Sequence, residues 1–131
     1  MTTTVTRDED PMGVWPTVQH AMTQLEIDKR IALEHELAEF LFKTARAGGF
    51  IPQKVWDGGE FVRSDDDDKV LIDAIFSVDE STAYFKHATL GVYCAVIVLG
   101  NDGWDAIADC STGPGWDEVI KAVEDMFEPR D

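Results

Sequence analysis

Residues 17–47 carry the longest regular alternation of apolar and polar positions in the chain. Apolar residues recur there at the three- and four-residue spacings of one side of a helix, with charged residues between them. These apolar positions are Leu25, Ile31, Leu37, Phe40, Leu41 and Ala45. Gly48 and Gly49 end the pattern, because glycine commonly follows the last residue of a helix. We therefore predict a long α-helix from about Thr17 to Ala47, with Pro16 near its first turn.

A short hairpin or an irregular loop is expected next. Two apolar pairs, Val55-Trp56 and Phe61-Val62, flank the turn-forming residues Asp57 to Glu60. This arrangement is typical of a hairpin, but a loop held in place by Trp56 and Phe61 would give the same pattern.

A middle helix is predicted from about Asp65 to Val78. Ser64 is a good N-cap, and acidic residues in a first turn complement the helix dipole. An apolar side follows, formed by Val70, Leu71, Ala74, Ile75 and Val78. A strand is the alternative, because β-branched residues are frequent here.

Three apolar stretches with short turns between them predict an antiparallel meander of at least three strands. They cover residues 82–88, 92–100 and 104–111. The middle stretch is almost wholly apolar, as expected for a strand covered on both faces or well covered on one. Asn101, Asp102 and Gly103 suit a tight hairpin turn, so this turn is explained without a ligand. Asp105 and Asp109 are expected to share one face of the last strand.

The chain is predicted to close with a helix from Trp116 to Phe127, which has an apolar side and an acidic side. The fold class is therefore α+β: an antiparallel meander with a long N-terminal helix, a middle helix and a C-terminal helix packed on it. We expect one such domain over residues 14–131 and a flexible arm over residues 1–13, which are polar and then acidic.

Charge changes the picture more than composition does. The chain has 26 acidic and 11 basic residues in 131, a formal net charge of −15, while its apolar content of 44% is ordinary. Such a charge disfavours direct binding to nucleic acid or to an anionic membrane. It favours a basic partner or a cation, or it simply keeps the protein in solution. No apolar leader is present and the longest apolar run is too short to span a bilayer, so we expect a cytoplasmic protein.

No residue set predicts a catalytic centre, a metal site or a cofactor. His35 to Glu39, "HELAE", lacks the second histidine of a zinc-protease helix, and the run Asp65–Asp68 lacks the alternate ligand spacing of a calcium loop. Cys94 and Cys110 lie in apolar strands, where free thiols stay protonated; a disulfide across the hairpin is the alternative. A small metal-dependent enzyme built on His35, Glu36 and clustered aspartates is an alternative hypothesis.

Acidic residues occur along the whole chain and form a continuous ridge on the last helix. Such a surface can imitate a phosphate backbone and occupy a basic groove that binds nucleic acid. We therefore expect a non-enzymatic binding protein. Its candidate contact residues are Asp65, Asp66, Asp67, Asp68, Asp102, Trp104, Asp105, Asp109, Asp117, Glu118, Glu124 and Asp125. The alternative is an accessory subunit that assembles through an aromatic surface around Trp56, Phe61 and Trp104.

The segment from Ile72 to Asp109 contains an "IFxxDE" stretch, an aromatic strand and a "GNDGWDxIxD" hairpin. In these features it resembles small, largely uncharacterised proteins of bacteria and their phages. The resemblance implies a compact cytoplasmic domain carried by a phage or mobile element. It further implies an inhibitor of a host defence complex, in the manner of anti-CRISPR proteins. It covers under half of the chain and transfers no catalytic residue.

Overall fold

A computed structural model describes the backbone of residues 14–64 and 66–129 and the side chains of residues 24–64 and 66–129. The chain divides into two compact units, Met1–Ala32 and Leu33–Asp131, and the division falls inside the first helix. The predicted arm over residues 1–13 and the candidate contact Asp65 lie outside the described residues. The expected single domain over residues 14–131 stays a prediction.

Helix α1 runs over Val14–Ala47, so it begins slightly before the predicted residue and places Pro16 in its first turn. The predicted apolar side is only partly buried. Leu25 and Ile31, in the first unit, are 58% and 39% exposed, whereas Leu37 and Leu41, in the second unit, are buried. Leu25 and Ile31 are exposed because no other described element lies in the first unit to cover them.

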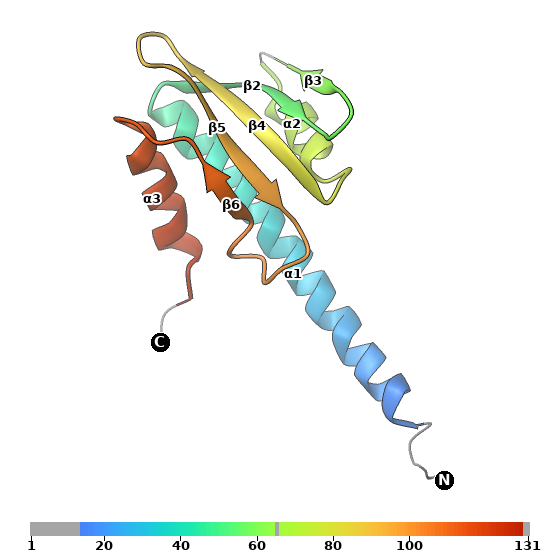
Figure 1. The fold of residues 1–131 in the computed structure, drawn as a ribbon. Coiled ribbons are helices and arrows are strands. Elements are labelled where there is room, and N and C mark those ends of the chain that lie inside the picture. The colour runs from blue at the N-terminus through green and yellow to red at the C-terminus, as the bar shows by residue number, and fades with distance from the viewer. Residues whose placement is uncertain (1–13, 65, 130–131) are drawn as a thin grey trace. The chain divides into compact units, whose positions relative to one another are not determined.

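The second unit is built on a five-stranded sheet in which every neighbouring pair is antiparallel. The strand order is β3-β2-β4-β5-β6, as Figure 1 shows. The strands are β2 (Phe50–Trp56), β3 (Phe61–Arg63), β4 (Glu80–His87), β5 (Gly91–Val98) and β6 (Ile107–Cys110). The predicted α+β class is confirmed, and β4, β5 and β6 form the predicted meander. The β2–β3 hairpin adds two more strands, with β2 rather than β3 next to β4.

The β2–β3 hairpin forms because Asp57 organises its turn. The Asp57 carboxylate accepts hydrogen bonds from the backbone N–H groups of Glu60 (2.8 Å) and Gly59 (2.9 Å). These two donors stabilise the ionised form and lower the pKa of Asp57. The hairpin interpretation is therefore correct, and the alternative of an irregular loop is wrong.

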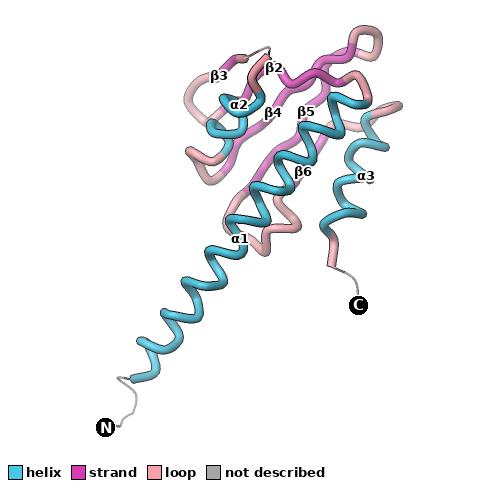
Figure 2. The backbone as a smooth tube through the Cα atoms, turned by 180° about the vertical axis from the view of Figure 1, so that it is seen from behind, coloured by secondary structure: helices cyan, strands magenta, loops and turns pink. Residues whose placement is uncertain are grey.

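Three helical segments cover one face of the sheet: the second-unit part of α1, α2 (Asp68–Ile75) and α3 (Trp116–Phe127) (Figure 2). Helix α2 is shorter than predicted at both ends. Asp67, not Ser64, is its N-cap and accepts a hydrogen bond from Lys69 N–H. Ser64 Oγ instead accepts from Asp67 N–H, which orders the residues before the helix. The alternative of a strand here is wrong.

Trp116 fixes α3 against the sheet. Its side chain is fully buried, with ring centroids 5.2 Å from Phe50, 5.0 Å from Phe85 and 5.9 Å from Tyr93. Close aromatic pairs of this kind contribute beyond the area they bury. The position of α3, and hence of every acidic residue on it, depends on this cluster.

The connection between β5 and β6 is not the tight turn that the sequence predicts. It runs from Leu99 to Ala106, and both Gly100 (φ 102°) and Gly103 (φ 99°) have left-handed backbone. The buried Glu34 carboxylate on α1 accepts a hydrogen bond from Gly100 N–H at 2.9 Å. The prediction failed because it considered local turn preferences alone, whereas α1 supplies a partner that holds a longer loop.

Candidate functional site

An apolar hollow lies between α1 and α3. Leu33 and Phe40 contribute to it from α1, and Met126 and Phe127 contribute from the last turn of α3. Glu36, Glu39 and Lys43 complete the lining of this open groove of about 540 Å³. We call it the α1–α3 groove; all of its residues belong to the second unit.

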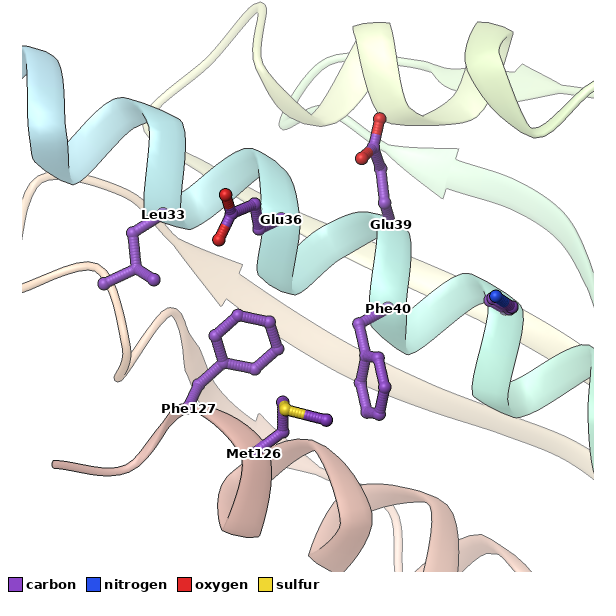
Figure 3. Close-up of a pocket in the computed structure, with 7 residues that line it drawn as sticks. Leu33, Glu36, Glu39, Phe40, Met126 and Phe127 are labelled. Carbon is purple, nitrogen blue, oxygen red and sulfur yellow. The ribbon is translucent and has the colours of Figure 1, made fainter. Parts of the chain in front are cut away.

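Helical spacing explains why these side chains meet. Leu33, Glu36, Phe40 and Lys43 follow one another at steps of three and four, which places them on one side of α1. The Phe40 and Phe127 rings meet edge to face at 5.7 Å. In Figure 3 both rings and the Met126 side chain lie between the helices, and Glu39 points away from α3.

The groove is apolar inside, and two carboxylates and Lys43 stand along its α1 border. Met126 is 60% exposed, which is unusual for a large apolar side chain next to two phenylalanines. Glu36 and Glu39 are exposed, and no ion pair among the described residues involves either carboxylate. On α3, Glu124, Asp125 and Glu128 flank Met126 and Phe127 in the sequence.

A second, smaller hollow of about 280 Å³ lies beside this region. It gathers the carboxylates of Asp105, Glu124 and Glu128 with the side chain of Trp104. The apolar residues Leu37, Ile107 and Val123 complete its lining. Trp104, Asp105 and Glu124 were predicted as contact residues, and the structure brings these three together. Within residues 14–64 and 66–129, no group of three or more His, Cys, Asp or Glu residues is placed to hold a metal ion.

The acidic residues near α2 form a separate group with structural contacts. Asp68 makes a two-point ion pair with Arg46, through Nε–Oδ2 at 2.7 Å and Nη2–Oδ1 at 2.6 Å. The hydrogen bond to Asp68 raises the pKa of Arg46 above the ordinary value for arginine. Asp67 caps the helix, and Asp66 is exposed. Because α2 contacts β2, β3 and β4, this group lies toward the opposite edge of the sheet from β6.

The remaining predicted contact residues are distributed over the β6 side and α3. Asp117 accepts from Gly113 N–H at 3.0 Å, Glu118 is exposed, and Asp125 pairs with Lys121. Asp102 N–H donates to the Asp105 carboxylate within the loop.

The prediction that Asp105 and Asp109 share one face of a strand is wrong, because β6 begins only at Ile107 and Asp105 lies in the preceding loop. Asp109 faces away from the helices, opposite Val96 of β5.

Histidine and cysteine positions have local explanations. The His35 ring stacks on Phe76 at 3.6 Å with an angle of 7° between the rings, so His35 is a packing contact between α1 and the end of α2. Cys94 and Cys110 are free thiols. Cys110 pairs with Ala95 of β5, so their side chains share one face of the sheet. Cys94 precedes Ala95 in the same strand and therefore points to the other face, so the two thiols project from opposite faces. This geometry explains why the alternative of a disulfide is wrong.

Sequence reasoning missed the groove because it assigned Phe40, Met126 and Phe127 to ordinary core-facing sides of two helices. The end of α3 carried the signal that could have revealed the groove. The apolar side of this helix continues to its last residue, Phe127, and in the sequence Glu124, Asp125 and Glu128 stand next to these last apolar residues. Leu33 was not singled out at all, and Glu128 was named only as part of the acidic side of the last helix.

Comparisons with known protein families, with curated proteins and with solved structures find no match for this chain. Among the described helices, none combines the length and the apolar character that crossing a membrane requires.

Proposed function

We propose that this chain is a non-catalytic binding protein that occupies a basic surface of a partner protein. The observation that carries the proposal is the α1–α3 groove, an apolar hollow with the carboxylates of Glu36 and Glu39 at its border, on a protein of net charge −15. Apolar side chains of the partner would enter between Phe40 and Met126, and Lys or Arg side chains beside them would meet the carboxylates.

An amphipathic basic segment suits this groove better than an extended charged chain does. Helices that dock in grooves place apolar anchors at i, i+3, i+4 and i+7, which matches a groove formed between two helices. Long-range attraction between the acidic protein and a basic segment would raise the rate of association, and salt would weaken it.

A partner surface that ordinarily binds nucleic acid is the class that the charge favours, because such surfaces are rich in Lys and Arg. The chain would then act as a competitor of the nucleic acid. The host defence complex implied by the resemblance, the phage origin and the cytoplasmic location stay predictions.

The two alternative hypotheses gain less support. The metal-dependent enzyme was to be built on His35 and Glu36, but His35 stacks on Phe76 and Glu36 borders the groove. The aromatic surface of the accessory subunit is divided, because Trp56 and Phe61 lie on the β2–β3 hairpin while Trp104 lines the hollow beside α3.

A pair of synthetic peptides tests the proposal. The first contains leucine and lysine arranged so that a helix has all its leucines on one side; the second has the same composition in scrambled order. We expect calorimetry to show tighter binding of the amphipathic peptide, with an affinity that falls as salt rises. Equal affinity for both peptides would mean that charge alone acts, and no binding of either would refute the proposed function.

A further inference from the structure

The face of the sheet that the helices leave uncovered is unusually apolar. We call it the open sheet face. An antiparallel sheet with one face in water normally has polar residues on that face. Strand β5 instead presents Val92, Cys94, Val96 and Val98, because their neighbours Ala95 and Ile97 point into the core. No element within residues 33–64 and 66–129 covers these valines.

Aromatic side chains continue this surface across the sheet. The Trp56 and Phe61 ring centroids are 4.8 Å apart, and the Phe61 and Tyr84 centroids are 5.9 Å apart. Trp56 is 36%, Phe61 41% and Val92 57% exposed. The open sheet face therefore exposes large apolar side chains on the β2–β3 hairpin and on β5, with Tyr84 and the polar residues of β4 between them. Exposed apolar surface of this kind marks interaction sites.

We propose that the open sheet face binds a second copy of this chain, so that two sheets pack face to face. The twofold axis lies between the two sheets and runs perpendicular to the strands. The proposal does not depend on the α1–α3 groove, which is on the helical side of the sheet.

The charges at the two ends of β4 select this arrangement. Glu80, Thr82, Tyr84 and Lys86 alternate on the open sheet face, with Glu80 at one end and Lys86 at the other. Half a turn about an axis that crosses β4 at Ala83 places Lys86 of each copy opposite Glu80 of the other. Half a turn about the strand direction would instead oppose Lys86 to Lys86, which like-charge repulsion disfavours.

The same axis also matches cations with aromatic rings. Lys54 pairs in register with Tyr84 and Trp56 pairs with Thr82, so the half turn brings Lys54 of one copy over Trp56 of the other. On β3, Arg63 pairs in register with Lys54 and Phe61 with Trp56, so the same half turn brings Arg63 of one copy opposite Phe61 of the other. Lys54 Nζ already lies 4.4 Å from the Phe61 ring centroid within one chain. Cations over aromatic faces attract, more strongly when water is excluded.

The area of the face is sufficient for a weak dimer. The sheet has five strands, and its longest strands have 8 residues. With strands of 7, 3, 8, 8 and 4 residues, a strand spacing of about 4.8 Å and a rise of about 3.4 Å per residue, the face measures roughly 500 Å² per copy. The pair would bury about 1,000 Å², below the range of about 1,200–2,000 Å² typical of stable interfaces, so we expect a weak dimer that dissociates on dilution.

Sedimentation equilibrium on the full chain over a range of concentrations tests the proposal. We expect the mass to rise from the 14.6 kDa of one chain toward twice that value. Lys86→Glu and Glu80→Lys should each raise the dimer dissociation constant about tenfold, because each mutation creates two symmetric like-charge contacts. The double variant exchanges the partners and should restore the wild-type constant.

Two further variants complete the design. Lys69→Glu makes the same change in net charge as Lys86→Glu, but on the exposed side of α2, and should leave dimerisation unchanged. Val96→Asp should give a monomer, and circular dichroism checks that it folds. If it does not fold, the Lys86→Glu and Glu80→Lys variants and their double variant still test the proposal.

Several results would overturn the inference. One is a mass of a single chain at every concentration; another is a dimer that is insensitive to all of the sheet-face variants. A monomer whose tryptophan fluorescence is quenched by a single-stranded oligothymidylate would assign the open sheet face to nucleic acid instead, and would equally overturn it.

Discussion

Truncating Met126 is the sharpest test of the α1–α3 groove. The side chain is 60% exposed in the free protein, so most of its apolar surface is still available to a ligand. Fully burying a methionine side chain contributes about 1.5–3 kcal/mol. Covering the exposed three-fifths would therefore contribute about 1–2 kcal/mol, and Met126→Ala should weaken binding of the amphipathic leucine–lysine peptide about 5- to 30-fold.

Stability should change less than affinity in this variant. The part of Met126 that is already buried is the smaller part, so the free energy of unfolding should fall by about 1 kcal/mol or less. Calorimetric titration measures the affinity, and urea unfolding measures the stability. Leu25→Ala is the matched control, because Leu25 also lies on a helix, is 58% exposed and does not line the groove.

The reasoning fails if Met126→Ala and Leu25→Ala bind the peptide equally well. It also fails if Met126→Ala loses affinity only in proportion to a loss of folded protein. Either result would mean that the exposed methionine is not part of a ligand contact.

Three other predictions concern single residues. Asp68→Asn removes one charge of the two-point pair with Arg46, so urea unfolding should show a loss of about 1 kcal/mol, smaller in high salt. Trp116→Ala empties the centre of the aromatic cluster and should cost about 3–5 kcal/mol. Trp116→Phe should cost clearly less, and thermal unfolding would contradict the packing argument if the two variants were equal. Burial, followed by the nearby Asp109 carboxylate, raises the pKa of the Cys110 thiol. Cys110 should therefore react slowly with iodoacetamide at neutral pH, and its reaction should become faster only when the pH exceeds the ordinary pKa of a cysteine thiol. Rapid labelling at neutral pH would contradict this.

The elements of the fold could be predicted because their signals are local. Apolar periodicity indicated α1 and α3, and the Asp57 turn between two apolar pairs indicated the β2–β3 hairpin. The prediction failed where a distant residue supplies the partner. Glu34 holds the loop at Gly100 across 66 positions of sequence, and no turn preference reports such a contact.

The candidate site was less predictable for the same reason. The acidic character of α3 was evident, but the groove exists only because Phe40 of α1 and Phe127 of α3 meet in space. The apolar outer face of β5 was evident in sequence as an unbroken apolar stretch. Its significance depends on knowing that helices cover one face of the sheet only.

The most direct test of the central claim is a residue-resolved footprint of the amphipathic peptide, recorded by NMR titration of the ¹⁵N-labelled protein. We predict that the shifted amides cluster at Leu33–Lys43 of α1 and at Glu124–Phe127 of α3. Shifts centred on Asp66–Asp68 before α2, or spread evenly over all acidic segments, would contradict the claim that this groove is where the protein binds its partner.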